Sequence, residues 1–446
     1  GGTQGYLVPL SVLWGEDNLR FGAPKLSWTM ARIRTGSRLG AILDGSYDER
    51  FMRDLLAAIR KGEDIPAEGG TIRVTATPAL AALDLDGAIR SVGVEQSNVS
   101  AIANDQAIVK AYRRLRGGEQ PEITVTRFLT ETGGYRNTPA FLGAAEYVPD
   151  DGEPLAIAIV LGFVRNQGNA WDVTLNALDV DLRAHDLAGG DGIMAPFAYP
   201  LDLGTTLGRR IGELHAAFTT PTKDRAFKTD AITERDIARW VKETTRDVTR
   251  ALDIVKHVLP SLDEATRKDA AALLAARKAI LKRVAATADH KPSGLKSRIH
   301  GDLHLGQVLV AQDDVYIIDF EGEPQRSLAE RRERTSALRD VAGMLRSFDY
   351  AAWSAIDRFR TVAGTLDDRL RDRAFAWRAS AIADFMGEYE AAAGDRQFLP
   401  APELRRALLD LFLIQKAAYE VQYEAANRPS WLSIPVRGLL GILDRG

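Results

Sequence analysis

The stretch from Arg298 to Glu321 constrains the fold of this chain more than any other part of the sequence. It opens with the run Arg-Ile-His-Gly-Asp-Leu-His-Leu-Gly-Gln and continues with two short β-branched runs on either side of the polar turn 311–314. Two such runs around a polar turn predict a β-hairpin. We therefore expect a loop that leads directly into a hairpin and brings polar side chains to its open end.

If the hairpin is centred in the middle of its turn, Gln307 lies opposite Ile318, and Asp302, Gln307 and Asp319 come together. A loop carboxylate, an amide and a carboxylate at a strand end are groups that phosphoryl transfer uses. Asp302 would accept the proton of an attacking hydroxyl group. Gln307 and Asp319 would hold the Mg²⁺ that neutralises the phosphates of ATP.

Two other interpretations of this loop stay open at this point. His300, Asp302 and His304 alternate along the chain, as the ligands of a metal hydrolase do. The same three residues also suit a hydrogen-bonded structural loop, because short motifs often mislead. The remaining histidines are scattered: His185, His215, His257 and His290. Because they offer no second ligand pair, we rank zinc chemistry below phosphoryl transfer.

The length and composition of the chain limit the classes of protein to which it can belong. Its 446 residues are many for one hydrophobic core, so two or three domains are expected. The 58 basic and 61 acidic residues give a formal charge of -3, which offers no electrostatic basis for binding nucleic acid or an anionic membrane. The absence of cysteine excludes a disulfide framework and agrees with a cytoplasmic location. No apolar run reaches membrane-spanning length.

The pattern along the chain predicts an α+β protein with three parts. Residues 1–90 alternate short apolar runs with turn residues, which predicts a β-rich N-terminal cap domain with one helix. Residues 91–165 predict a small β-sheet lobe that binds nucleotide. Residues 166–446 predict a large helical C-terminal lobe with the catalytic loop and the substrate pocket. In this lobe we expect His215 to be a hydrogen-bonded core residue and Asp340 to brace the catalytic loop.

A lysine in the predicted small lobe is a candidate phosphate ligand. Lys110 lies inside the apolar strand 107–112, where an ammonium group costs desolvation energy unless it meets anions. Nucleotide phosphates would supply them, whereas an edge-strand lysine that faces water is the alternative. The loop 96–100 lies where a phosphate-covering flap is expected, although it contains no glycine. Its candidate phosphate-binding residues are Ser97, Asn98 and Ser100.

The next helix offers an anionic partner for this lysine. A helix is predicted over 121–132, with Glu122 in its first turn. We expect Glu122 to pair with Lys110, with Glu119 as the second choice. A first-turn acid that serves only the helix dipole is the alternative.

The C-terminal helix carries an aromatic pair, Tyr419 and Tyr423, and an acidic pair on adjoining ridges. Aromatic faces with carboxylates and an arginine suit a sugar, whose C–H faces stack on rings while its hydroxyl groups form hydrogen bonds. The expected substrate-binding residues are His304, Glu321, Tyr419, Glu420, Tyr423, Glu424, Arg428 and Trp431. The alternative is a tyrosine pair packed in the helical core, with a glutamate paired to Arg428.

Five runs of the sequence carry a family resemblance when they are taken together. They are 95–100, 300–309, 318–324, 338–352 and 419–431. These runs resemble the bacterial maltokinases, which are relatives of the aminoglycoside phosphotransferases. The resemblance implies a bilobal protein-kinase-like fold over the chain from about residue 94 to its end.

The resemblance also implies an activity and a set of roles. Maltokinases use ATP and Mg²⁺ to phosphorylate maltose at its anomeric hydroxyl group, and trehalose synthase can be their fused or complexed partner. By motif, Asp302 would be the base, Gln307 and Asp319 the metal ligands, and Lys110 the phosphate-binding lysine. This chain has Thr124 where the family has a glutamate, so either Glu122 would take its place or the ion pair would be absent. The cap begins inside the cap of its relatives and is expected to be incomplete.

Two rival functions follow from the same residues. The first is a kinase for another small substrate, such as glucosamine or an aminoglycoside, because the catalytic loop is common to this wider group. The second is a catalytically silent domain that docks on trehalose synthase and regulates it.

Overall fold

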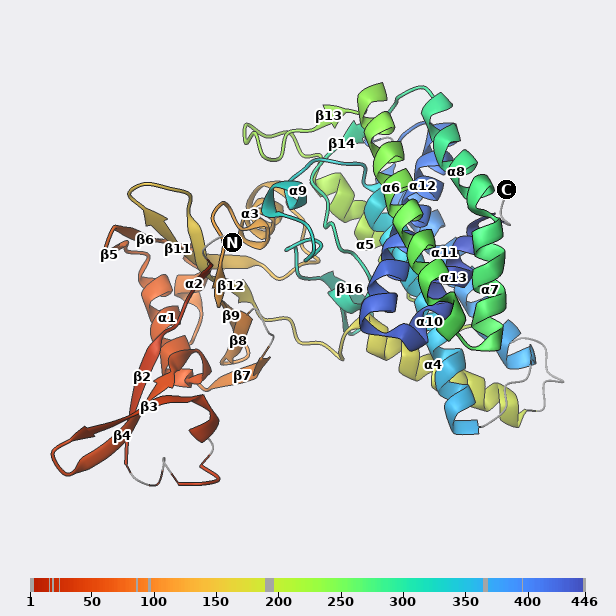
Figure 1. Cartoon of the computed structure of the whole chain (residues 1–446). Coiled ribbons are helices and arrows are strands. Elements are labelled where there is room, and N and C mark those ends of the chain that lie inside the picture. The colour runs from red at the N-terminus through yellow and green to blue at the C-terminus, as the bar shows by residue number, and fades with distance from the viewer. Residues whose placement is uncertain are drawn as a thin grey trace. The chain divides into compact units, whose positions relative to one another are not determined.

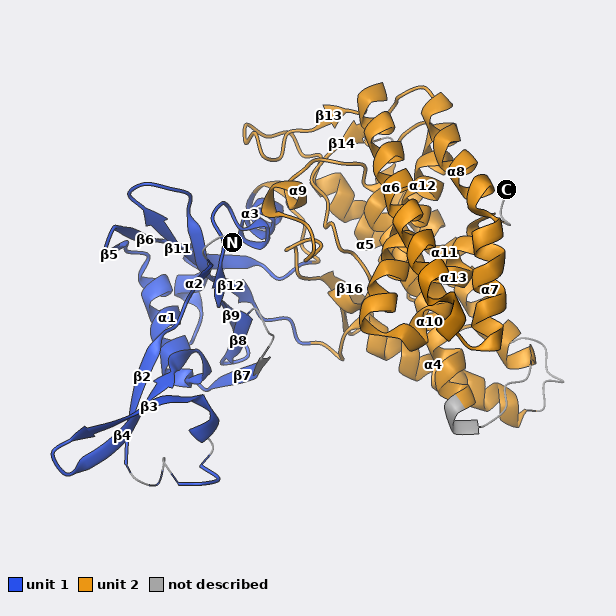
Figure 2. Cartoon of the chain, viewed as in Figure 1, with its two compact units in different colours: residues 1–131, 138–165 blue, residues 132–137, 166–446 orange. Residues whose placement is uncertain are grey.

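The structure of the chain is a computed structural model that describes all residues except 1–3, 16, 18, 19, 24, 86, 95–97, 189–195, 364–367, 395 and 444–446. The chain forms two compact units, which are blue and orange in Figure 2. Unit 1 contains residues 1–131 and 138–165, and unit 2 contains residues 132–137 and 166–446.

Unit 1 begins with a three-stranded antiparallel sheet. Its strands, in spatial order, are β2 (Leu10–Trp14), β4 (Arg38–Asp44) and β3 (Thr29–Thr35). Helix α1 (Glu49–Lys61) follows this sheet. The Asp48 side chain accepts a hydrogen bond from the Arg50 amide at its start, and Gly62 adopts a left-handed conformation at its end. The expectation of one helix in residues 1–90 is wrong, because a second, short helix, α2 (Pro78–Ala82), also lies in this range.

A seven-stranded antiparallel sheet forms the main body of unit 1. In spatial order its strands are β5 (Ile65–Ala67), β6 (Gly70–Ala76), β11 (Phe141–Pro149), β12 (Leu155–Gly162), β9 (Ala107–Tyr112), β8 (Asn98–Ala103) and β7 (Ile89–Val94). Smaller elements complete the unit: β1 (Gly5–Tyr6) paired with β10 (Arg114–Leu115), α2 (Pro78–Ala82) and α3 (Pro121–Phe128). The sheet takes strands from both sides of residue 90, so the division into cap and lobe stays a prediction.

Apolar side chains pack against this sheet in two core clusters. Helix α1 contributes Met52, Leu56 and Ile59 to one cluster, and α3 contributes Ile123 to the other. Strand β12 contributes to both clusters because successive side chains of a strand point to opposite faces. The predicted helix 121–132 ends at Phe128 and continues as a single π-helical turn.

Unit 2 is mainly helical, as the sequence predicts (Figure 1). Its helices are α4 (Ala170–Leu187), α5 (Gly204–Ala217), α6 (Glu234–Val258), α7 (Glu264–Ala275), α8 (Arg277–Ala286), α9 (Leu328–Arg331), α10 (Leu338–Ala363), α11 (Asp368–Ala393), α12 (Pro402–Asn427) and α13 (Ser433–Leu443). A break at Ala276 separates α7 from α8. Within the described part of the chain, no helix combines the length and the hydrophobicity that crossing a membrane requires.

Helices α5 and α11 approach each other closely along a line of glycines. Gly204, Gly208 and Gly212 recur every four residues on α5 and face the α11 backbone. A Cβ atom on Gly204 would lie 2.7 Å from the carbonyl oxygen of Ala381. Larger residues on this face of α5 would therefore push the two helices apart.

Two short antiparallel pairs complete unit 2: β13 (Asp230–Ala231) with β14 (Leu295–Lys296), and β15 (Val308–Ala311) with β16 (Asp314–Ile317). The β15–β16 pair is the predicted hairpin, and Val308 lies opposite Ile317. One residue beyond this pair, the Ile318 amide donates to the Gln307 carbonyl oxygen over 3.0 Å. The predicted register is therefore confirmed.

Candidate active site

The loop before the hairpin is anchored to helix α10 by Asp340. One carboxylate oxygen, Oδ2, accepts hydrogen bonds from the His300 amide at 2.7 Å and from His215 Nε2 at 3.1 Å. The other oxygen, Oδ1, accepts from the Gly301 amide at 2.9 Å. Burial raises the pKa of Asp340, but hydrogen bonding and charge from His215 outweigh this effect and lower the pKa below its usual range. The predicted bracing role of Asp340 and the core position of His215 are confirmed.

His300 ties the same loop to the hairpin. Its Nδ1 atom accepts a hydrogen bond from the Asp302 amide at 3.3 Å, so Nε2 carries the proton and donates to the Ile318 carbonyl oxygen at 2.9 Å. Both ring nitrogens are therefore engaged in the protein. His304 also uses a ring nitrogen, Nδ1, to accept from the Gly306 amide at 3.0 Å. This arrangement argues against the zinc interpretation of the two histidines.

Asp302 lies on this loop with its carboxylate partly exposed. Its Oδ1 atom is 3.2 Å from the ammonium nitrogen of Lys416, which reaches the loop from helix α12. Burial raises the pKa of Asp302, but the nearby charge, above all that of Lys416, and the Lys416 hydrogen bond outweigh this effect, so the pKa lies below its usual range. Asp302 is therefore ionised at neutral pH, as a general base must be.

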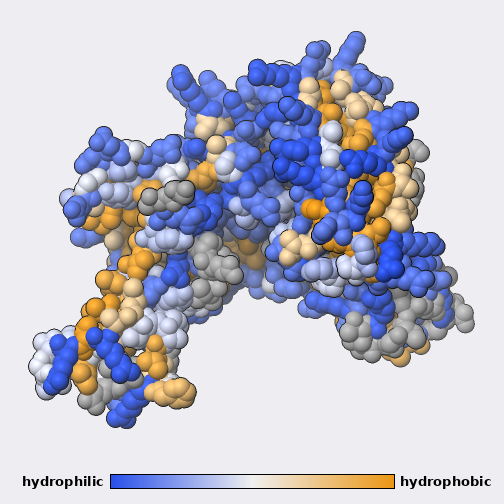
Figure 3. All heavy atoms as spheres, in the orientation of Figure 1, coloured by the Kyte–Doolittle hydropathy of each residue, from blue (hydrophilic) through white to orange (hydrophobic). Residues whose placement is uncertain are grey.

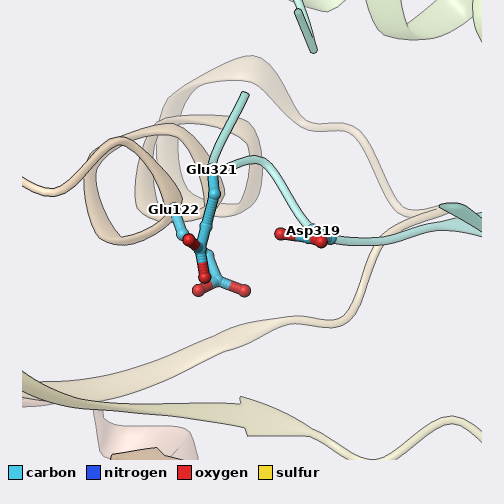
Figure 4. A group of neighbouring side chains, drawn as sticks. All are labelled: Glu122, Asp319 and Glu321. Carbon is cyan, nitrogen blue, oxygen red and sulfur yellow. The ribbon is translucent and has the colours of Figure 1, made fainter. Parts of the chain in front are cut away.

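Gln307 and Asp319 meet at the open end of the hairpin, as predicted. The Gln307 side-chain amide donates to Asp319 Oδ2 at 3.1 Å. The other oxygen, Asp319 Oδ1, is buried and has no hydrogen-bond partner among the described residues. Figure 4 shows the side chains of Asp319 and Glu321 on the segment that follows β16. One carboxylate oxygen of Asp319 lies within 4.8 Å of one of Glu321. Asp319 has a φ angle of 64°, a left-handed conformation that is uncommon outside glycine.

A pocket of about 360 Å³ opens beside Asp302 within unit 2. Residues from α6, α12 and the segment after β16 line it, and Asp302, Lys416 and Tyr419 share one part of its wall. Acidic and basic side chains both contribute to the lining; the acidic ones include Glu243, Asp247 and Glu323. A polar cavity with aromatic side chains can hold a small molecule rich in hydroxyl groups.

The predicted substrate residues are not all in this pocket. Tyr419 lines it, and the Tyr419 and Tyr423 rings stack with centroids 6.3 Å apart. Glu420 is buried and accepts hydrogen bonds from Arg346 at 2.6 and 2.9 Å, so its carboxylate has a structural partner. Glu424 is likewise paired with Arg428, at 2.6 and 2.9 Å.

The C-terminal part of this helix follows the structural alternative in its Glu424–Arg428 pair, whereas Tyr423 is exposed and not packed in the core. Arg428 lies over the Trp431 ring at 4.6 Å, and Trp431 in turn stacks on Tyr350 with centroids 6.4 Å apart. Tyr423, Glu424, Arg428 and Trp431 are not among the described residues that line the pocket, and neither are His304 and Glu321.

In unit 1, Lys110 and Glu122 form the predicted ion pair. Both are buried, and Lys110 Nζ lies 3.0 Å from Glu122 Oε2. The Tyr112 hydroxyl donates to the same carboxylate oxygen at 2.6 Å. The second choice, Glu119, is exposed. The ion pair with Lys110 therefore forms although Thr124 stands where a glutamate was expected, because Glu122 supplies the carboxylate.

Two candidate residues of the predicted phosphate-covering loop lie in a strand. Asn98 and Ser100 belong to strand β8, where Ser100 pairs with Lys110 in the sheet. Ser97 lies outside the described residues. The nucleotide-binding roles of these three residues stay predictions.

Sequence reasoning missed two residues near Asp302. Lys416 and Glu323 both line the pocket, and Lys416 contacts the predicted base directly. The spacing of Lys416 and Tyr419, three residues apart on one helix, was the available signal. That signal places the lysine on the same helical face as a predicted substrate residue, but it cannot identify a partner 114 positions earlier in the chain.

Comparisons with known proteins agree with this geometry. Residues 182–322 match the model of the family described as "Phosphotransferase enzyme family". The chain is 26% identical over 357 residues to a glucosamine kinase of Mycolicibacterium smegmatis, covering 80% of both proteins. It is 25% identical over 420 residues to a glucosamine kinase of Streptacidiphilus jiangxiensis, covering 93% of this chain and 86% of that protein. These matches support an enzyme of the phosphotransferase family and give no particular support to maltokinase.

Solved structures extend the comparison to the fold. A glucosamine kinase structure (crystal form A) matches with a TM-score of 0.68 at 22% identity, covering 92% of this chain and 85% of that one. A glucosamine kinase in complex with glucosamine, ADP and inorganic phosphate matches with a TM-score of 0.68 at 21% identity, covering 93% and 91%. The chain therefore has a kinase-like fold with an N-terminal β-sheet lobe and a helical C-terminal region, as predicted.

Proposed function

We propose that this chain is an ATP-dependent kinase that transfers a phosphoryl group to a hydroxyl group of a small sugar. The observation that carries the proposal is Asp302, an ionised carboxylate on the wall of a polar pocket and on a loop that both α10 and the hairpin hold. Such a carboxylate accepts the proton of a bound substrate hydroxyl group while the oxygen of that hydroxyl group attacks the γ-phosphate. The rigid loop fixes the direction of approach, which supplies much of the catalysis in phosphoryl transfer.

The end of the hairpin suits a magnesium ion. Gln307 and Asp319 offer amide and carboxylate oxygens, the donors that Mg²⁺ prefers. The buried Asp319 Oδ1 fits this role because it has no hydrogen-bond partner among the described residues. Glu321 is close enough to Asp319 to contribute a third oxygen. When bound, Mg²⁺ neutralises the charge of the nucleotide phosphates.

Lys110 would bind the nucleotide phosphates in unit 1. Its ammonium group is held by Glu122 at 3.0 Å, so its direction is fixed before nucleotide binds. The Tyr112 hydroxyl supports the same glutamate. A lysine paired with a helix glutamate is the arrangement that protein kinases use at this step.

Glucosamine is the first substrate to test. The support comes from two relatives named glucosamine kinase that match 80% and 93% of this chain. The pocket lining also contains the carboxylates of Glu243, Asp247 and Glu323, but each of them is already paired with an arginine, so the two relatives carry the choice of glucosamine.

Maltose is the second candidate, and the motif resemblance of the run 419–431 is what favours it. The structure pairs Glu420 with Arg346 and Glu424 with Arg428, so the carboxylates expected to bind sugar hydroxyls already have partners. A complex with trehalose synthase rests on the resemblance alone.

A substrate panel tests the proposed function. ADP release would be measured with MgATP and glucosamine, maltose, glucose, trehalose or kanamycin, and ³¹P NMR would locate the phosphate on the product. The proposal expects turnover with at least one sugar, and turnover with glucosamine above that with maltose. If only kanamycin is phosphorylated, the proposed substrate class changes from a small sugar to an aminoglycoside. Nucleotide binding without turnover of any compound would favour the silent regulatory domain.

A further inference from the structure

Lys416 is the charged side chain whose position the proposed roles do not yet explain. It belongs to α12, a helix that packs against both α6 and α10, so its backbone is well fixed. Its ammonium group lies 3.2 Å from Asp302 Oδ1 and 5.0 Å from the centre of the Tyr419 ring. A lysine loses side-chain entropy when it is held in this way, and the ion pair and the ring contact offset that loss.

The two oxygens of Asp302 have different surroundings. Oδ1 faces Lys416, whereas no hydrogen bond to Oδ2 is found within the part of the chain that the structure describes. The His300 ring cannot substitute for Lys416, because its nitrogens are occupied by the Asp302 amide and the Ile318 carbonyl group. Burial lowers the pKa of His304, so this neighbour is largely neutral at pH 7.

We infer, building on the proposed function, that Lys416 is a positioning residue of the reaction centre. Its ammonium group donates a hydrogen bond to Asp302 Oδ1 and so fixes the rotation of the carboxylate. The other oxygen, Oδ2, is then left to accept the proton of the sugar hydroxyl group. Tyr419 lies three residues further along α12 and lines the same pocket, so one helix turn orients both the base and the substrate.

The ion pair also favours the charged form of the base. Lys416 lowers the pKa of Asp302 through its charge, and its own pKa is raised because Asp302 and Glu323 outweigh the effect of burial. Other titratable groups surround Asp302 and would shape its titration. They are His300 and His304 on its own loop, Asp340 on α10, Asp319 and Glu323 after β16, and Tyr419 on α12.

The test compares Lys416→Met, which removes the charge at similar length, with Lys416→Arg, which keeps it. Lys256→Met on the exposed side of α6 is the matched control. With glucosamine and MgATP, Lys416→Met should lower kcat on the order of 10- to 100-fold, because a supporting group of a catalytic residue is lost, while KM for ATP changes less than about twofold. Lys416→Arg should recover part of kcat, and the control should match the unmodified chain. Unchanged kcat in Lys416→Met, with an active unmodified chain, would overturn the inference.

A second readout does not depend on the substrate. The Asp302 carboxyl carbon would be titrated by ¹³C NMR and assigned by its absence in Asp302→Asn. The midpoint should be higher in Lys416→Met than in the unmodified chain or in Lys416→Arg. Equal midpoints would overturn the inference even if no sugar were phosphorylated. If no compound of the substrate panel is phosphorylated but the Asp302 midpoint is higher in Lys416→Met, the ion pair is supported and the proposed function is refuted.

Discussion

Asp340→Asn is the substitution whose effect can be worked out most fully from the structure. The carboxylate accepts three hydrogen bonds, at 2.7, 2.9 and 3.1 Å, and is 2% exposed. An asparagine keeps one acceptor oxygen and puts an NH₂ group in place of the other. In either orientation of the amide, this NH₂ group faces a backbone N–H of His300 or Gly301, so at least one backbone donor loses its partner in the protein.

The expected cost is about 2–4 kcal/mol in the stability of unit 2. One unsatisfied buried donor costs about 1–3 kcal/mol, and loss of the charge weakens the remaining hydrogen bonds. The effect also depends on pH. Because the pKa of Asp340 is lowered in the folded protein, its contribution to stability is present above the unfolded-state pKa of about 4 and is lost as the pH falls through the folded pKa. Asp340→Asn should therefore lose less stability on acidification than the unmodified chain.

Two assays check this prediction. Urea unfolding followed by tryptophan fluorescence reports mainly on unit 2, which holds five of the seven tryptophans. Hydrogen exchange of the peptide 298–305 reports directly on the amides of His300 and Gly301, which should exchange faster in the variant. Asp384→Asn, at an exposed position of α11, is the control and should shift stability by less than about 0.5 kcal/mol. Unchanged exchange in Asp340→Asn would refute the bracing role.

Three further perturbations probe other parts of the account. Glu122→Gln should remove the carboxylate 3.0 Å from the buried Lys110 ammonium and lower the thermal midpoint of unit 1, at a cost of about 3 kcal/mol, measured by calorimetry; an unchanged midpoint would contradict the pair. Gly208→Ala should destabilise unit 2 by about 1–3 kcal/mol because its Cβ would clash with the α11 backbone. Gly387→Ala, which meets no atom within 4 Å, should be neutral or stabilising, and equal effects of the two glycine variants would exclude close packing as the cause. Asp319→Ala should abolish the Mg²⁺ dependence of ADP binding in calorimetric titrations, and wild-type dependence would argue against its metal role.

Local features of the site were predictable from the sequence. The hairpin register follows from two short β-branched runs and a polar turn, and it placed Gln307 opposite Ile318. The partner of Lys110 was also predictable, because Glu122 opens the helix that comes shortly after its strand. These relations join residues that lie close together in the sequence, so few alternatives compete.

Long-range partners were not predictable in the same way. Glu420 was expected to face a sugar because its spacing on the helix matches Glu424, but Arg346, 74 positions earlier, occupies its carboxylate. The spacing places a residue on a helical face and does not say whether a buried charge already has its counter-charge. Lys416 escaped notice for the same reason, since its partner Asp302 comes from another element of unit 2.

The two parts of the predicted N-terminal region share a sheet for a related reason. Strand β6 pairs along its length with β11, a strand about 70 positions later. Alternation of apolar residues identifies each strand but does not identify its neighbours in a sheet. The sequence pattern alone therefore could not show that strands on both sides of residue 90 join one sheet.

The measurement that tests the central claim most directly is the turnover of Asp302→Asn with glucosamine and MgATP. The account predicts that kcat falls by a factor on the order of 100 or more, because general-base assistance is lost, while MgATP affinity is retained. The isosteric change leaves the pocket and the loop backbone in place, so a loss of binding alone cannot explain the loss of turnover. Turnover close to that of the unmodified chain would contradict the assignment of Asp302 as the base.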